Sequence, residues 1–163
     1  MSGEATVDEK SSRFQPRMIV SGGQTGVDRG ALDAAIQLGY DHGGWCPKGR
    51  LAEDGSVPSR YALQENNSRD YAVRTEQNVV DSDATLIFYL RKLSGGTLLT
   101  FRLAKQHEKP YMLVRLDKPW DCQAVKTWMH RIRPERLNVA GPRESSNPGV
   151  QELSRLATLR VLG

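Results

Sequence analysis

The strongest constraint on the fold is a repeated alternation of short apolar runs with longer amphipathic stretches. The clearest run is ATLIFYL at 84–90, which is continuous, apolar and short enough for a buried strand. Such alternation is typical of repeated β-α units, in which parallel strands are joined by helices. Strands are predicted at 18–20, near 44–46, at 84–90, 111–116 and 137–140, and helices at 27–38, 70–80, 97–107, around 125–132 and from Pro148 onward.

Five strands and about five helices in near-strict alternation indicate an α/β fold. Because β-α-β crossovers are right-handed in almost all proteins, they place helices on both faces of a parallel sheet. The prediction is therefore a three-layer sandwich with a mostly parallel sheet of about five strands. A length of 163 residues suits one domain, predicted at 17–163, and the polar segment 1–16 is predicted to be a flexible tail.

Composition excludes several classes of protein. No stretch reaches the ~18 apolar residues that a membrane span needs, and 1–16 contains no apolar signal-peptide core. The two cysteines, Cys46 and Cys122, have no metal-binding or redox spacing, so we expect a cytoplasmic protein. The net charge of +4 comes without a long basic run or an RNA-binding signature, and no nucleic-acid partner is predicted.

The loop after the first predicted strand has the composition of an anion-binding turn. Its sequence, SGGQTGVDR at 21–29, joins glycines to the start of a helix, where unpaired N–H groups favour phosphate. Thr25 and Asp28 have capping-box spacing, which favours a capping role for Asp28 over contact with a ligand. Arg29 opposes the helix dipole unless it meets an anion, although a solvated or salt-bridged arginine is an equal alternative.

Two further loops repeat this combination of glycine, hydroxyl and cation. Ser94-Gly95-Gly96-Thr97 follows the most apolar strand and begins a helix. The segment 141–148, after the last strand, carries Arg143, which can bind an oxyanion through two hydrogen bonds. Asn147 and Pro148 fit the cap and first residue of the final helix. In open α/β sheets ligands lie outside the carboxyl ends of strands, so these loops predict one anion-binding site.

Evidence for catalysis is sparse by comparison. The three histidines have no metal-ligand spacing, and no nucleophile motif is present, so neither a metal site nor a catalytic residue is predicted. Glu53, Asp54 and Glu65 lie in a long polar loop, where a solvated charge is the default interpretation. The same loop holds Lys48 and Arg50, which we expect to fold over a ligand as cationic contacts.

At these loops the chain resembles the molybdenum cofactor carrier protein family. That family is a circularly permuted branch of the Rossmann-like superfamily that includes the lysine-decarboxylase-like phosphoribohydrolases. The resemblance covers nearly the whole chain from Met18 onward, in the order of the family. The matching stretches are SGGQTGVDRGALDAA (21–35), GGWCPKGRLAEDG (43–55), RTEQNVVDSDATLIF (74–88), LSGGTLLT (93–100) and NVAGPRESSNPG (138–149).

The resemblance implies a Rossmann-like fold and a homo-oligomer, either dimer or tetramer. It also implies binding of the molybdenum cofactor (Mo-molybdopterin), protection of it, and transfer through transient contact with molybdoenzymes or insertion machinery. The residues predicted to bind the cofactor are Gly22, Gly23, Gln24, Thr25, Gly26, Arg29, Lys48, Ser94, Gly95, Gly96, Thr97, Gly141, Arg143 and Ser145.

One departure from the wider superfamily separates binding from catalysis. Its hydrolases place a glutamate three residues after the threonine of the glycine-rich motif, and here that position is Thr100, which cannot act as a carboxylate acid or base. Glu144 is the alternative carboxylate. The rival hypotheses are an N-glycosidase acting on nucleoside monophosphates and a nucleotide-sensing module.

Overall fold

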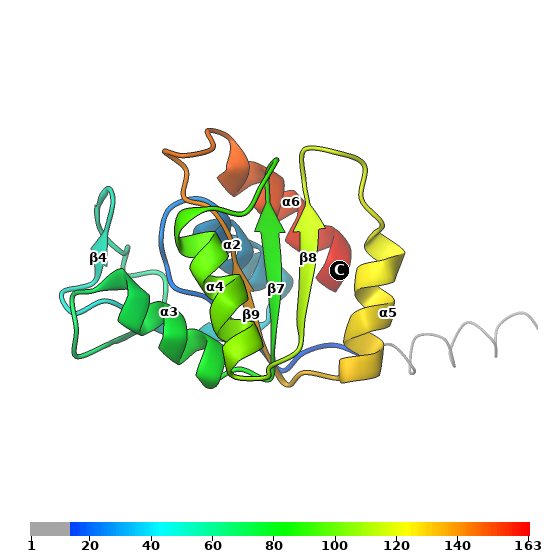
Figure 1. Cartoon of the computed structure of the whole chain (residues 1–163), viewed down its shortest axis with the longest axis horizontal. Coiled ribbons are helices and arrows are strands. Elements are labelled where there is room, and N and C mark those ends of the chain that lie inside the picture. The colour runs from blue at the N-terminus through cyan, green and yellow to red at the C-terminus, as the bar shows by residue number, and fades with distance from the viewer. Residues whose placement is uncertain (1–13) are drawn as a thin grey trace, which may run out of the picture.

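A computed structural model describes residues 14–163 and contains one central sheet of five parallel strands. The strand order is β2-β1-β9-β7-β8. Helices packed on parallel strands confirm the predicted α/β, Rossmann-like fold (Figure 1). Parallel pairing is explained by the helices that return the chain between strands. The strands are β1 (Met18–Val20), β2 (Asp41–Gly43), β7 (Ala84–Tyr89), β8 (Tyr111–Arg115) and β9 (Arg136–Ala140).

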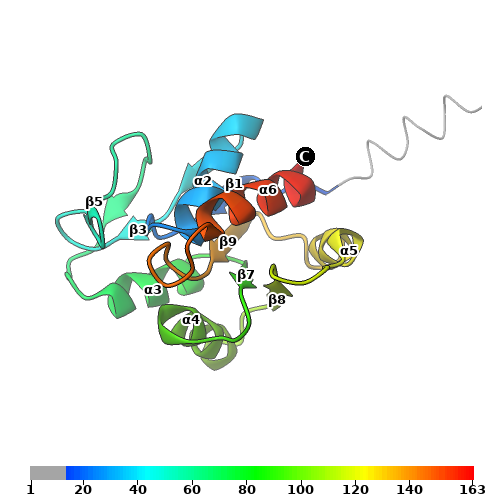
Figure 2. The same ribbon diagram turned by 90° about the horizontal axis from the view of Figure 1, so that it is seen from above.

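Five helices cover the two faces of this sheet. Helices α2, α6 and α5 lie on one face, with α2 against α6, while α3 and α4 pack together on the other (Figure 2). This arrangement is the three-layer sandwich expected from right-handed crossovers. The helices are α2 (Val27–Leu38), α3 (Tyr71–Val80), α4 (Gly95–Gln106), α5 (Cys122–Ile132) and α6 (Val150–Leu162).

The second strand of the sheet differs from the prediction. The strand predicted near 44–46 is divided at Gly44, whose φ of +128° turns the chain, and only β2 joins the sheet. A Cβ at Gly44 would lie 2.2 Å from the backbone oxygen of Ser21, so this turn requires glycine. Beyond it, β3 (Trp45–Cys46) pairs with β6 (Gln64–Glu65), and β4 (Leu51–Ala52) pairs with β5 (Gly55–Ser56).

We call residues 45–66 the arm, because they leave the sheet after β2 and form small paired strands of their own before α3. The arm has its own small apolar cluster, in which Tyr61, Val57 and Leu63 pack with Leu32 of α2. Arg50 donates to the backbone oxygens of four arm residues, from Val57 to Leu63, and thereby fixes its shape. The arm is therefore a built part of the domain rather than an open loop.

The main core lies between the sheet and the α2–α6–α5 layer. Its centre is formed by Ile19, Leu86, Phe88, Leu137 and Val139, all at most 1% exposed. Of the predicted tail 1–16, residues 1–13 lie outside the described residues, and Phe14 packs against this core. The alternation of apolar runs thus identified four of the five strands of the sheet, β1, β7, β8 and β9, but not β2.

Two helices bury faces that their apolar spacing did not indicate. In α6, Leu153 and Leu156 are 42% and 46% exposed, and the helix begins after Gly149 rather than at Pro148. Small residues make its buried contact: a Cβ at Gly30 of α2 would lie 2.0 Å from Ser154 Oγ. In α3, Val73 and Val80 are likewise about 40% exposed. The side chains that α3 buries are Arg74, Asn78 and Val79.

Candidate functional site

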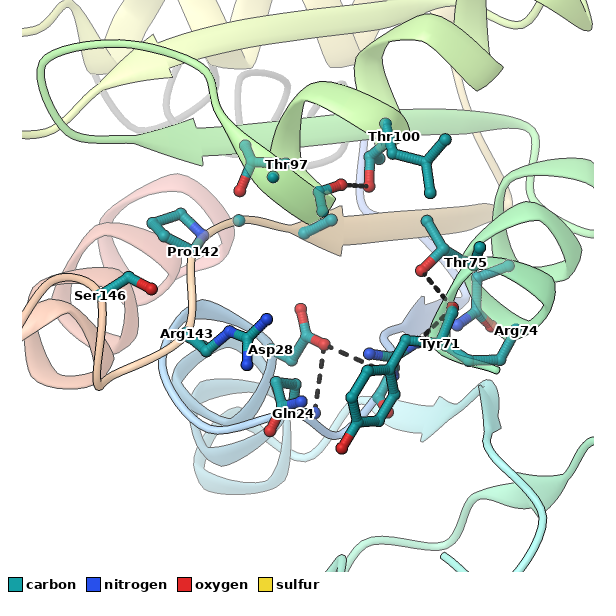
Figure 3. A pocket seen from close by; sticks show the side chains of 18 of the residues that line it. Gln24, Asp28, Tyr71, Arg74, Thr75, Thr97, Thr100, Pro142, Arg143 and Ser146 are labelled. Carbon is teal, nitrogen blue, oxygen red and sulfur yellow. Dashed lines mark hydrogen bonds and ion pairs between the residues drawn. The ribbon is translucent and has the colours of Figure 1, made fainter. Parts of the chain in front are cut away.

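The carboxyl ends of three strands enclose a cavity of about 170 Å³. In the sheet, β9 lies between β1 and β7. The chain runs outward from β1 to β2 at one edge and from β7 to β8 at the other, so the connections leave β9 in opposite directions. Such a divergence opens a crevice between loops, which is where α/β sheets bind ligands. The loops after β1, β7 and β9 line this cavity together with α3 (Figure 3).

The first turn of α4 presents its backbone to the cavity. Ser94 is extended and makes no side-chain cap, and within residues 14–163 no acceptor is bound by the N–H groups of Gly95, Gly96 and Thr97. Gly95 needs glycine because its φ is +52°, whereas Gly96 has no such strain. A Cβ at either position would meet nothing within 4 Å. The open space beside Gly96 therefore allows a ligand to reach the helix N-terminus.

The structure brings together predicted residues from all three glycine loops. The ones that line the cavity are Gly22, Gln24, Ser94, Gly95, Gly96, Thr97, Gly141 and Arg143. Two of these positions have no room for a side chain. A Cβ at Gly22 would lie 2.3 Å from Arg74 Nη1, and one at Gly141 would lie 2.4 Å from the backbone oxygen of Phe88. The other predicted residues, which lie outside the lining, are Gly23, Thr25, Gly26, Arg29, Lys48 and Ser145.

Arg29 forms the salt bridge that was the alternative to anion binding. Its guanidinium donates to both oxygens of Asp54 at 2.5 and 2.8 Å, and its Nε donates to Gly23 O at 3.0 Å. The side chain is buried under the arm, so Asp54 is not a freely solvated loop charge. The Arg29 contact holds the pKa of Asp54 below its ordinary value.

Glu53, the neighbour of Asp54 in the arm, joins two of the glycine loops. It accepts hydrogen bonds from Thr25 Oγ1, Ser145 Oγ and Ser145 N, and Arg143 Nη1 lies 3.7 Å away. Thr25 thus contacts the arm instead of capping α2, whose cap residue is Gly26. Burial raises the pKa of Glu53, but the hydrogen bonds from Ser145 and Thr25 outweigh it and lower the pKa overall.

Removing this carboxylate should loosen the loop at 141–149. We expect Glu53→Gln to lower the free energy of unfolding by about 1–3 kcal/mol, because several hydrogen bonds to a charged acceptor are weakened. Urea unfolding measures the change, and faster amide exchange at Ser145 locates it. Glu65→Gln is the matched control, because Glu65 accepts one exposed hydrogen bond, from Gly49 N. Equal effects in the two variants would contradict the role given to Glu53.

The cavity also contains polar side chains outside the set predicted to bind the cofactor. They are contributed by the start of α2, by α3, by α4 and by β9: Asp28, Tyr71, Arg74, Thr75, Asn78, Thr100 and Asn138. Arg74 and Asn78 are four residues apart, which places them on one helix face, but only the structure shows that this face is buried. Thr100 Oγ1 donates to Gly96 O at 2.9 Å. Glu144, the carboxylate considered in place of the glutamate of the hydrolases, accepts from the N–H groups of Gly149 and Gln151.

Arg74 and Asp28 form the most deeply buried charged pair of the cavity. Arg74 is 6% exposed, and its Nη1 donates to Gly22 O at 2.5 Å and lies 4.0 Å from Asp28 Oδ2. Asp28 also accepts from Gln24 N at 3.2 Å. Burial raises the pKa of Asp28 from 3.8 to about 6, although Arg74 and the Gln24 hydrogen bond act in the opposite direction.

The described part of the chain offers neither a metal centre nor a membrane helix. Within residues 14–163, no three His, Cys, Asp or Glu side chains converge as metal ligands would. No helix in that range combines the length and apolar character needed to cross a bilayer. The cavity therefore has to be interpreted from its hydrogen-bonding groups and from its two arginines and one carboxylate.

Comparison with known proteins supports assignment to a family. The model of the circularly permutated YpsA SLOG family matches residues 19–162. A crystal structure of a proposed molybdenum carrier protein from Syntrophus aciditrophicus SB is 43% identical in sequence, with a TM-score of 0.86. The match covers 91% of this chain and 96% of the other. A search of curated protein sequences finds no match. On the family match across nearly its whole length, this chain belongs to the circularly permutated YpsA SLOG family.

Proposed function

We propose that this protein binds the molybdenum cofactor as cargo, through its phosphate and pterin groups, and transfers it to molybdoenzymes or insertion machinery. The observation that carries the proposal is the uncapped first turn of α4, open at Gly96, in a cavity that also contains Arg143. Free N–H groups and the positive end of a helix favour phosphate, and an arginine adds a charged donor. Similarity to a proposed molybdenum carrier protein, at 43% identity, supports a molybdenum-related ligand.

The dimensions of the cavity suit a carrier. A volume of about 170 Å³ is below the roughly 300–1,000 Å³ typical of sites that enclose a drug-sized ligand. One end of the cofactor would be held while the remainder stays near the surface, which makes release possible without unfolding. A homo-oligomer is part of this proposal, and exposed Leu153 and Leu156 on α6 supply apolar surface for it.

Cargo binding is tested by loading the purified protein with molybdopterin and removing the unbound fraction. We expect bound pterin, measured by fluorescence after oxidation, together with a fixed ratio of molybdenum to chain when the metal-containing form is used. Competition by inorganic phosphate should lower both signals. Absence of retained pterin at every concentration tested would contradict the proposal.

Gly96→Ala should separate binding from stability. The added Cβ has free space, so the free energy of unfolding should be unchanged or rise by up to about 1 kcal/mol. The same Cβ would occupy the approach to the helix N-terminus, and affinity for the cofactor should fall about tenfold, or 1.4 kcal/mol. Titration with cofactor and urea unfolding of the same preparation measure both quantities. Unchanged affinity would exclude a phosphate at this turn.

A second candidate function, hydrolysis of an N-glycosidic bond, is favoured by Asp28. A buried carboxyl group whose pKa is raised to about 6 in a cavity has the properties of a general acid. In this reaction water would add to the ribosyl carbon of a nucleoside monophosphate as the N-glycosidic bond breaks. The base would leave with the proton of Asp28, and the proton released by the water would restore the acid. Release of free base and ribose 5-phosphate on incubation with nucleoside monophosphates would favour the hydrolase over the carrier.

A further inference from the structure

The carboxyl group of Asp28 is built into the wall of the cavity with one oxygen still available. Asp28 is 7% exposed and lies in the first turn of α2, between Gln24 and the loop that carries Arg143 (Figure 3). Its Oδ2 accepts from Gln24 N, but within residues 14–163 no hydrogen bond reaches Oδ1. The neighbouring Ser21 hydroxyl donates to Val139 O at 3.0 Å instead. Because Oδ1 is not among the enclosed atoms that lack a partner, it is accessible from the cavity that Asp28 lines, and a ligand can supply its donor.

Arg74, the cation paired with Asp28, has a guanidinium donor without a protein acceptor among the described residues. Its Nε donates to Tyr71 O at 3.3 Å and its Nη1 to Gly22 O, which fix the guanidinium in place. No acceptor in the described part of the chain is bound by Nη2. Arg74 Nη1 lies 4.0 Å from Asp28 Oδ2, and both residues line the cavity. A ligand edge that carries N–H donors next to a carbonyl would match this pair.

Charge excludes the phosphate from this end of the cavity. Two anions would repel each other in a buried site, so a phosphate should lie at the first turn of α4 and not against Asp28. The ligand that fits both ends has an anionic group at one end and adjacent N–H donors at the other. A 2-amino-4-oxopyrimidine edge has a ring N–H and an amino group beside a carbonyl oxygen, and a carboxylate can accept from both donors at once.

Resting on the proposed function, we infer that Asp28 and Arg74 recognise the 2-amino-4-oxopyrimidine edge shared by pterins and guanine. Asp28 accepts from the ring N–H and the 2-amino group, and Arg74 Nη2 donates to the 4-oxo group. This assignment places the heterocycle against α2 and α3 and the phosphate against α4. It predicts selection against phosphorylated ligands that lack the 2-amino group.

Four probes test the inference by calorimetric titration near pH 7.5. GMP and 6-hydroxymethylpterin phosphate carry the edge, IMP lacks the 2-amino group, and inorganic phosphate has no heterocycle. We expect the wild-type protein to bind GMP or the pterin phosphate at least tenfold more tightly than IMP, because a donor to a buried charged acceptor is lost. The tighter of the first two identifies the heterocycle that the site prefers.

Asp28→Asn is the variant, because it keeps the size of the side chain and removes its charge. The GMP-to-IMP ratio should fall to near one, while phosphate affinity should be unchanged or higher. Glu152→Gln is the matched control, since Glu152 forms an exposed ion pair with Arg155 on α6, and it should leave every affinity unchanged. A GMP preference that survives in Asp28→Asn would overturn the inference while leaving the phosphate site intact.

Titrations of the wild-type protein at several pH values provide a second test, which does not depend on whether the Asp28→Asn variant folds. Around Asp28, the charged groups that face it are Arg74 from α3 and Arg29 from α2, and burial raises its pKa to about 6. Between pH 7.5 and pH 5 the GMP-to-IMP ratio should fall several-fold, because protonated Asp28 loses acceptor capacity. The phosphate titrates equally in both nucleotides, so it cancels in the ratio. A constant ratio would contradict the inference, and failure of all four probes to bind would reject the proposed function with it.

Discussion

Replacing Arg74 with methionine should lower the free energy of unfolding by about 3–5 kcal/mol near pH 7. This loss of stability is expected because the substitution leaves two buried polar groups without their partner. Asp28 would remain a buried carboxylate without its nearest cation, and Gly22 O would lose the donor that lies 2.5 Å away. A buried charge without compensation is among the few causes of so large a loss from one substitution.

Urea unfolding of three variants would check the origin of this loss. Arg102→Met is the matched control, because Arg102 is an exposed arginine on α4, and its loss should cost under about 0.5 kcal/mol. The double variant Arg74→Met with Asp28→Asn should recover a large part of the deficit, because the uncompensated charge is gone. Additive losses in the double variant would show that Arg74 acts through packing and not through Asp28.

Asp28 itself should make the protein less stable as the pH rises from 4 to 7. The pKa of Asp28 is raised from 3.8 in the unfolded chain to about 6 in the folded protein, so the folded state holds a proton that the unfolded state has released. Stability that is fully present below pH 3.8 is lost as the pH rises toward 6. A shift of about two pH units corresponds to about 3 kcal/mol.

The measurement is the difference in unfolding free energy between wild type and Asp28→Asn across this range. Because other titrating groups are common to both proteins, the difference isolates Asp28. It should change by about 2–2.5 kcal/mol between pH 4 and pH 7, with the variant relatively more stable at the higher pH. A difference that stays constant with pH would mean that the folded protein does not raise the pKa of Asp28.

Both predictions concern the buried charged pair of Asp28 and Arg74, whose desolvation lowers the stability of the protein. A domain with a purely structural role would not need such a pair. An apolar pair at positions 28 and 74 would fill the same space without desolvating charges. The presence of Asp28 and Arg74 in this interior is therefore consistent with a ligand that uses them. The arm contributes differently, because its Glu53 and Asp54 hold the loops and Arg29 in fixed positions around the site.

Prediction from sequence succeeded where structure depends on neighbours in the chain. The apolar run at 84–90 became β7, and the helix predicted at 27–38 is confirmed as α2, which ends at the left-handed cap Gly39 with φ of +79°. Glycine loops after strands also predicted the right edge of the sheet, since parallel strands end at the same side. These features are encoded locally by side-chain periodicity and by the backbone freedom of glycine.

The composition of the site was decided by contacts between distant segments. Arg74 reaches Gly22 across 52 positions, and Ser145 reaches Glu53 across 92, so no local pattern distinguishes them from surface charges. Arg29 had an anion or a carboxylate as equally good partners, and only the folded arm brought Asp54 to it. Sequence by itself determined the layered fold and the edge that carries the loops. Tertiary structure decided which charges are buried there, because burial and pairing depend on the whole surrounding packing.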